Sequence, residues 1–164
     1  IVLLGIFLML FFLFKSLKTA LAAITPNLIA CFVILGTMGL LSIPLDLMTI
    51  TIAAITIGIA VDNSIHYIYR FKEEYEKNKS YEDSIRLCHS TVGVAILNTS
   101  ITIIFGFSIL VLSNFIPTIY FGVFTGIAMF LAMILVLTLL PSLILYIQPF
   151  EKRLNVWSTF GSFW

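Results

Sequence analysis

Charged residues are scarce in this chain of 164 residues, because Asp, Glu, Lys and Arg together make up only 10% of it, against about 25% in an average soluble domain. Hydrophobic residues make up 60%, and the mean hydropathy is +1.12. A helix that crosses the hydrocarbon core of a bilayer needs about 20 residues. The chain therefore has room for five or six spans and for no separate soluble domain, which predicts an all-α polytopic membrane bundle.

Other absences exclude whole function classes. An excess of positive charge is missing, since nine Lys and Arg stand against eight Asp and Glu, so no basic surface is available to bind a nucleic acid. The two cysteines, Cys31 and Cys88, lie in or beside apolar runs without CxxC spacing, which indicates packing residues. No nucleophile and base pair, metal cluster or phosphate-binding loop is recognisable, so we expect neither an enzyme nor a cofactor.

Five apolar runs alternate with polar connections. They cover residues 1–14, 20–43, 47–69, 91–112 and 118–147. The first run makes about 21 Å of helix, which is shorter than the hydrocarbon core, and it opens without the features of a signal peptide. We therefore expect the chain to be part of a longer protein, with 1–147 as one transmembrane domain and 148–164 as a cytoplasmic tail or linker.

The positive charges predict the orientation. All nine Lys and Arg fall after the first run, between the third and fourth runs, or after the fifth. By the positive-inside rule this side is the cytoplasm, so connection 70–90 and the tail are expected there. Within this connection, Ser80 and Asp83 form a capping-box pattern that predicts a short cytoplasmic connector helix starting near Tyr81.

Asp62 is the one formal charge well inside an apolar run. A carboxylate at that depth costs about 2.5–3.5 kcal/mol unless it is protonated or paired. At 100° per residue the polar groups of this run fall on one stripe, which must face protein or water. The stripe holds Thr51, Ile55, Gly58, Asp62, Ile65, His66 and Tyr69.

The stripe favours proton carriage. With the imidazole of His66 one turn away, Asp62 is expected to take up and release a proton near neutral pH. Two alternatives stay open. Asp62 can serve only to hold neighbouring helices together by hydrogen bonds, and His66 can be an interfacial residue that binds water.

Further residues are candidates to support such a proton relay or the packing around it. The fourth run presents an amide and several hydroxyls that suit a neighbour of Asp62, or that simply join helices. The candidates for relay support are Asn63, Tyr69, Asn98, Thr99 and Thr102, and those for close helix packing are Gly58 and the GxxxG pair Gly122 and Gly126.

Several stretches together resemble a known family. They are 39–47 (GLLSIPLDL), 58–74 (GIAVDNSIHYIYRFKEE), 97–102 (LNTSIT), 106–107 (GF), 121–122 (FG) and 139–141 (LLP). In order and spacing they resemble the resistance-nodulation-division (RND) superfamily of proton-driven transporters, especially its MMPL-like lipid-exporter branch and the related sterol-sensing domains. The resemblance implies helices two to six of one half of a transporter, with the first helix and a large extracytoplasmic domain upstream.

The resemblance places Asp62 at the position similar to the proton-carrying aspartate of the family. Two departures are visible. Asn63 stands where the lipid exporters often have an aromatic residue, and no acidic residue occurs near 135–137 in the last helix.

The sequence is therefore interpreted as the membrane half of a proton-driven exporter of lipids or other hydrophobic compounds in a bacterial plasma membrane. Its expected partners are protons, membrane lipids, a hydrophobic substrate and a second half-transporter in the same or a homologous chain. One alternative is a sterol-sensing-type bundle that binds lipid without transport. Another is a component similar to the Sec-associated translocation motor, whose Glu-Arg pair is here Tyr69 and Arg70.

Overall fold

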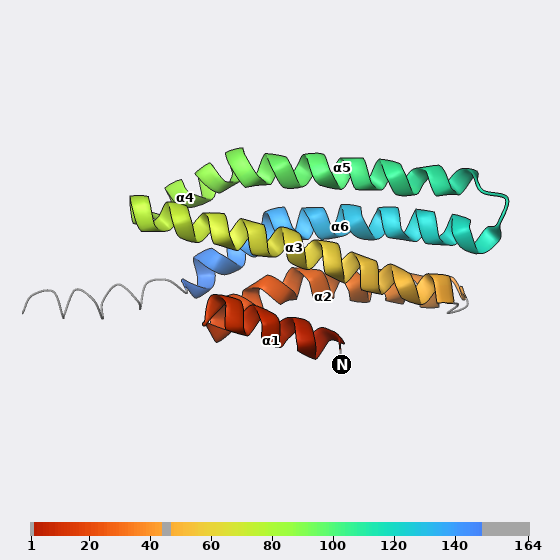
Figure 1. The fold of residues 1–164 in the computed structure, drawn as a ribbon, viewed down its shortest axis with the longest axis horizontal. Coiled ribbons are helices and arrows are strands. Elements are labelled where there is room, and N and C mark those ends of the chain that lie inside the picture. Colours follow the sequence, from red (N-terminus) through yellow and green to blue (C-terminus); the bar gives the residue numbers. More distant parts are fainter. Residues whose placement is uncertain (1, 44–46, 149–164) are drawn as a thin grey trace, which may run out of the picture.

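The structure is a computed structural model that describes residues 2–43 and 47–148, with the side chains of 2, 3, 48 and 49 excepted (Figure 1). Within this range it holds helices and turns and no strand, which confirms the predicted all-α fold class. The elements are α1 (Val2–Phe14), α2 (Leu17–Leu40), α3 (Leu47–Asn78), α4 (Tyr81–Cys88), η1 (His89–Gly93), α5 (Val94–Ile109), η2 (Leu110–Leu112) and α6 (Ile116–Ile147). The predicted tail, apart from Gln148, lies outside the described residues.

Four helical segments of the described chain are long and apolar enough to cross a membrane. They are Leu17–Leu40, Ile50–Asn78, Tyr81–Leu112 and Ile116–Ile147, and the shorter apolar helix Leu4–Phe14 lies beside them. The third of these is one continuous rod made of α4, η1, α5 and η2. Successive helices run in opposite directions along a common axis (Figure 1), as the alternation of apolar runs predicts.

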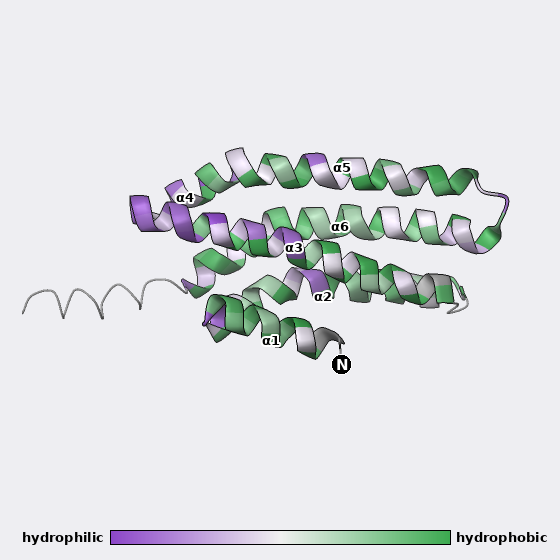
Figure 2. Ribbon diagram, in the orientation of Figure 1, coloured by the Kyte–Doolittle hydropathy of each residue, from purple (hydrophilic) through white to green (hydrophobic). Residues whose placement is uncertain are grey.

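Hydrophilic residues gather at the end of the bundle that holds the C-terminal part of α3 and all of α4 (Figure 2). We call this the charged end. The turn between α1 and α2 lies at the same end, and it carries Lys15, which adopts a left-handed backbone conformation with φ 49°. The turn between η2 and α6 lies at the opposite end.

Helix α3 continues beyond residue 69, where the apolar run stops, for another two and a half turns. Ion pairs along its surface stabilise this extension. Arg70 lies 2.9 Å from both Glu73 and Glu74, and Lys77 lies 2.8 Å from Glu73. Hydrogen bonds from Lys77 and then Arg70 lower the pKa of the Glu73 carboxyl.

The hairpin between α3 and α4 is stabilised by contacts between residues that are close in the sequence. Lys79 has φ 56°, which ends α3, and the Ser80 hydroxyl accepts a hydrogen bond from the Asp83 backbone N–H at 3.4 Å. The predicted capping interaction and the helix start at Tyr81 are thus confirmed. The rings of Tyr75 and Tyr81, 4.4 Å apart, pack the two helices together.

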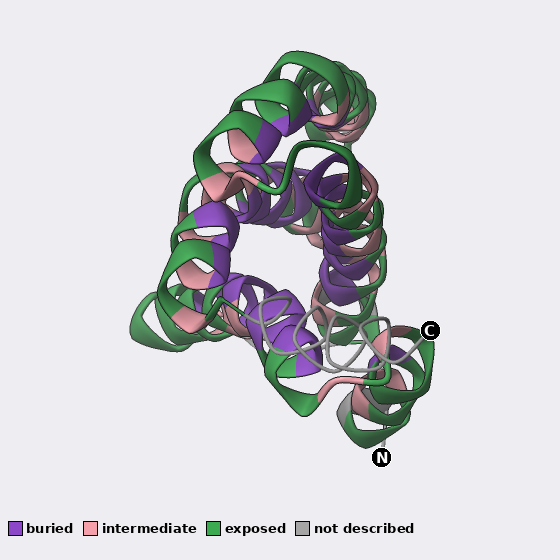
Figure 3. Ribbon diagram, turned by 90° about the vertical axis from the view of Figure 1, so that its left-hand side faces the viewer, coloured by how far each residue is buried: buried purple, intermediate pink, exposed green. Residues whose placement is uncertain are grey.

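The centre of the bundle is formed by α2, α3 and α6, which pack on one another, whereas α1 packs on α2 and α5 packs on α6. Small residues make the central contact, since Ala30, Ala60 and Ala132 are buried in one cluster. An end-on view shows the buried residues on the sides of the helices that face one another (Figure 3). Small residues at such interfaces let helix backbones approach closely.

Candidate functional site

Asp62 and His66 form a pair on the surface of the bundle. The Asp62 Oδ1 lies 3.5 Å from the His66 Nε2, and each side chain is 67% exposed. Within the part of the chain that the structure describes, His66 is the only hydrogen-bond or ion-pair partner of Asp62. The predicted proximity of the carboxyl and the imidazole, one helical turn apart, is therefore present, although hydrophobic neighbours do not enclose it.

The polar stripe of α3 faces outward, except that Ile55 and Ile65 are half-buried. Gly58 and Tyr69 are exposed like Asp62 and His66, and a Cβ at Gly58 would meet nothing within 4 Å. The opposite side of α3 is buried and includes Ser64, which accepts a hydrogen bond from the Asn27 amide. The stripe thus forms an open polar face at membrane depth, available to another protein surface or to water.

The polar groups of α5 do not reach Asp62. Asn98, Thr99 and Thr102 are exposed, and the Thr102 hydroxyl donates to the Asn98 carbonyl at 2.9 Å. We expected these residues to be neighbours of the carboxyl, but α6 packs against both α3 and α5 and so lies between the two helices. Asn63 is half-buried beside Asp62.

The glycines of α6 differ in their surroundings. A Cβ at Gly122 would lie 2.7 Å from the Phe107 carbonyl oxygen and 2.8 Å from the Leu110 Cβ, so at this point α6 and the end of α5 are in close contact. At Gly126, one turn on, a Cβ would meet nothing within 4 Å. The two glycines therefore do not act together as one packing motif against α5.

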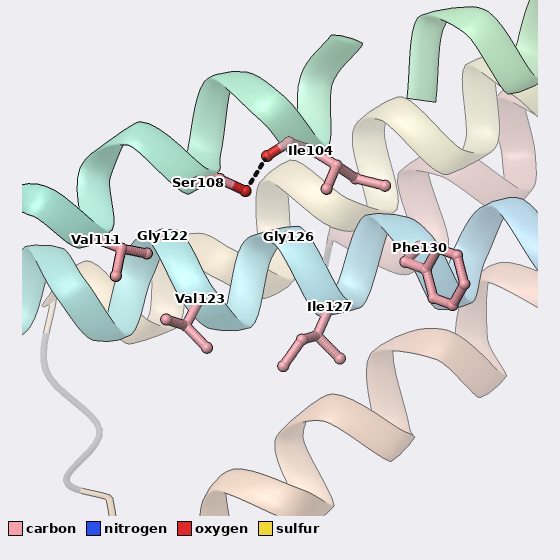
Figure 4. A pocket seen from close by; sticks show the side chains of 8 residues that line it. All are labelled: Ile104, Ser108, Val111, Gly122, Val123, Gly126, Ile127 and Phe130. Carbon is pink, nitrogen blue, oxygen red and sulfur yellow. Dashed lines mark hydrogen bonds between the residues drawn. The ribbon is translucent and has the colours of Figure 1, made fainter. Parts of the chain in front are cut away.

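The space beside Gly126 is part of a groove between the two helices. Its volume is about 340 Å³. Its lining is Ile104, Ser108, Val111, Gly122, Val123, Gly126, Ile127 and Phe130 (Figure 4). The Ser108 hydroxyl donates to the Ile104 carbonyl at 2.7 Å and is satisfied within α5, so the groove presents an almost wholly apolar wall. Such a wall suits a hydrocarbon chain better than a polar molecule.

A second polar cluster, which the sequence did not suggest, lies toward the charged end. His89 Nδ1 is 3.0 Å from the Tyr67 hydroxyl, and His89 Nε2 is 3.0 Å from the Leu137 carbonyl. His89 begins η1, a single turn of π-helix, and such turns often mark functional positions. The signal that could have pointed to it is Pro141, which has no N–H for the Leu137 carbonyl.

No group of three or more His, Cys, Asp or Glu side chains suited to a metal ion occurs in the described ranges. Cys31 and Cys88 are both free and buried. The fold defines the described part of the chain as a multi-pass helical domain whose long helices are apolar enough to cross a membrane.

Comparison with known families assigns the chain more closely. It belongs to the MMPL family, whose match covers residues 1–164, and this confirms the resemblance seen in the sequence. The chain is 34% identical to the membrane protein MJ1562 of Methanocaldococcus jannaschii and 26% identical to the hopanoid transporter HpnN of Burkholderia multivorans. Each alignment covers 93% of this chain, but only 40% of the first relative and 18% of the second. No solved structure matches the chain.

Proposed function

We propose that this chain is the membrane half of a proton-driven exporter of lipids or other hydrophobic compounds. The observation that carries the proposal is the outward-facing pair of Asp62 and His66 on α3. An ionisable residue inside a membrane span is costly and marks an ion or proton pathway by default. A carboxyl with an imidazole 3.5 Å away provides two adjacent groups that can each bind a proton.

The exposure of this pair argues for a second half-transporter. A carboxylate that faced lipid would pay the full cost of insertion, whereas a second bundle placed against the stripe would bury it or enclose it with water. The bare surface at Gly58 allows a neighbouring helix to approach one turn from Asp62. Asn98, Thr99 and Thr102 from one half are then candidates to face the aspartate of the other.

The lengths of the relatives agree with such a pairing. The aligned stretch is 40% of the archaeal protein but only 18% of the hopanoid transporter, so the transporter is more than twice as long. Two halves in one chain, or two shorter chains that associate, would both complete the stripe. Pseudo-symmetric halves around a central site are common in secondary transporters.

The substrate class rests on two observations. One relative is named as a hopanoid transporter, and the groove between α5 and α6 has an apolar lining at the depth of the membrane. The excess of Lys and Arg at the charged end supports a cytoplasmic location for that end in the plasma membrane.

The test is Asp62→Asn in the full-length transporter, assayed for gradient-driven export in vesicles. The amide keeps the size of the side chain but cannot change charge, so export should fall to background while expression and helicity are unchanged. Glu76→Gln, on the exposed part of the same helix, is the matched control and should retain export. His66→Gln should slow export and move its pH optimum. Full gradient-dependent export by Asp62→Asn would refute proton carriage by this residue.

A lipid-binding sensor without transport is the second candidate, and the α5–α6 groove favours it. The same vesicle assay distinguishes a lipid sensor from a proton-driven exporter. A sensor should bind lipid with equal affinity whether residue 62 is Asp or Asn, and it should move no lipid when a proton gradient is applied.

A further inference from the structure

Pro141 leaves one backbone carbonyl of α6 without its helical hydrogen bond, and a residue from another helical segment bonds to that carbonyl instead. The nitrogen of Pro141 carries no hydrogen, so the Leu137 carbonyl four residues earlier loses its usual helical donor. His89 lies 48 residues before Leu137, and its Nε2 is 3.0 Å from that carbonyl oxygen. A helical carbonyl that has lost its backbone donor needs another partner, and the imidazole supplies one.

This contact determines where the ring carries its hydrogen. The Leu137 carbonyl can only accept, so His89 Nε2 must donate. In the neutral imidazole the other nitrogen, Nδ1, then has a lone pair, and it accepts from the Tyr67 hydroxyl at 3.0 Å. The Tyr67 side chain is fully buried, so its hydroxyl also depends on this bond.

The same geometry accommodates the protonated ring. The Ile85 carbonyl oxygen lies 3.1 Å from His89 Nδ1 and cannot donate. When Nδ1 gains a proton, it can donate to Ile85, while Nε2 keeps its bond to Leu137. The hydroxyl hydrogen of Tyr67 then has to turn away from the ring and loses its acceptor, but no heavy atom needs to move.

We propose that His89 is a second proton-binding site, at the charged end of the bundle and separate from the pair of Asp62 and His66. The ring is exposed on one side, so protons reach it from the aqueous boundary. Its acceptors are two backbone carbonyls, and its hydroxyl partner comes from α3. The site therefore joins α3, α4 and α6, and binding of a proton strengthens its bond to α6 because a charged donor makes a stronger hydrogen bond.

The helices packed at the site carry these ionisable groups. On α3, Tyr67 contacts His89, and Arg70, Glu73 and Glu74 are paired with one another further along the helix. Helix α4 carries Tyr81, Glu82, Asp83, Arg86 and Cys88. The part of α6 between residues 130 and 144 contains no ionisable side chain. The groups in direct hydrogen-bond contact with the His89 ring are the two backbone carbonyls and Tyr67.

The experiment is a pH titration of isotope-labelled histidine by NMR, with the full-length protein in lipid nanodiscs. Difference spectra with His89→Gln and His66→Gln assign the two signals. We expect the His89 ring signals to change with pH, and the neutral form to carry its hydrogen on Nε2.

Two substitutions should shift the His89 midpoint in opposite directions. Tyr67→Phe removes the donor to the neutral ring, whereas the charged ring keeps Ile85, so the midpoint should rise by about 0.5–1 pH unit. Pro141→Ala gives Leu137 a helical donor that competes with the charged ring, so the midpoint should fall by a similar amount. The controls Tyr69→Phe and Pro26→Ala should leave it unchanged.

A neutral ring protonated on Nδ1, the absence of titration, or shifts of the same sign in both variants would each overturn the proposal. Asp62→Asn should not move the His89 midpoint. If that variant abolishes export while His89 still titrates, both proposals stand. If export survives and His89 titrates as expected, only the proposed function fails.

Discussion

The Asn27 amide donates a hydrogen bond to the Ser64 hydroxyl at 3.1 Å, and both side chains are buried between α2 and α3. Ser64 lies only two residues from Asp62, but two residues correspond to about 200° around a helix. A Ser64 that faces α2 therefore directs Asp62 away from the bundle. The hydrogen bond between Asn27 and Ser64 is therefore made in the same rotation of α3 that exposes Asp62.

The contact between Asn27 and Ser64 should be measurable as a coupling. In a double-mutant cycle of Asn27→Ala and Ser64→Ala, we expect an interaction free energy of about 0.6 kcal/mol, the average for hydrogen bonds between membrane helices, and at most about 1.7 kcal/mol. Unfolding in mixed detergent micelles would measure it. Thr56, which is buried but bonds within its own helix at Ile52, serves as the control, and Asn27→Ala with Thr56→Ala should be additive.

Gly122 and Gly126 should respond differently to an added methyl group. Gly122→Ala places a Cβ 2.7 Å from a backbone oxygen of α5, which cannot move as a flexible side chain does, so the free energy of unfolding should fall by about 1–3 kcal/mol. Gly126→Ala has open space and should be neutral within measurement error. Equal loss of stability in both variants would contradict the observed packing.

Single cysteines at Lys77 and Asn114, in a background without Cys31 and Cys88, should label from opposite sides of intact cells. Both positions are exposed, the first on the charged end of α3 and the second in the turn before α6. The positive-inside rule predicts that position 114 is reached from outside. Labelling of both from the same side would rule out the up-and-down arrangement.

The Glu73 carboxyl should titrate below the ordinary range of glutamate, because hydrogen bonds from Lys77 and Arg70 lower its pKa. The folded pKa is depressed, so the stabilising contribution is present above the unfolded pKa and is lost as the pH falls through the folded one. Carboxyl NMR shifts against pH would show it. Lys77→Gln should return the midpoint toward the ordinary value, whereas Lys72→Gln, whose ion pair is with Glu76, should not.

The helix start at Tyr81 was predictable because its cap is local: Ser80 and Asp83 are three residues apart, and their bond forms whatever the rest of the chain does. The pair of Asp62 and His66 was predictable for the same reason, since one helical turn brings them together. The contact of His89 with Leu137 was not, because it joins residues 48 positions apart and exists only when the rod of α4 and α5 lies along α6.

By itself, the sequence determined the number of long apolar helices, their alternation and the gathering of positive charge at one end. It could do so because a backbone in hydrocarbon must satisfy its hydrogen bonds within each helix, and a run of about 20 apolar residues is enough to require this. Only the tertiary structure decided which face of α3 is open and that α6 separates Asn98 from Asp62. In lipid, helices are not sorted by burial of apolar surface, so their neighbours depend on the fit of small residues such as Ala30, Ala60 and Ala132.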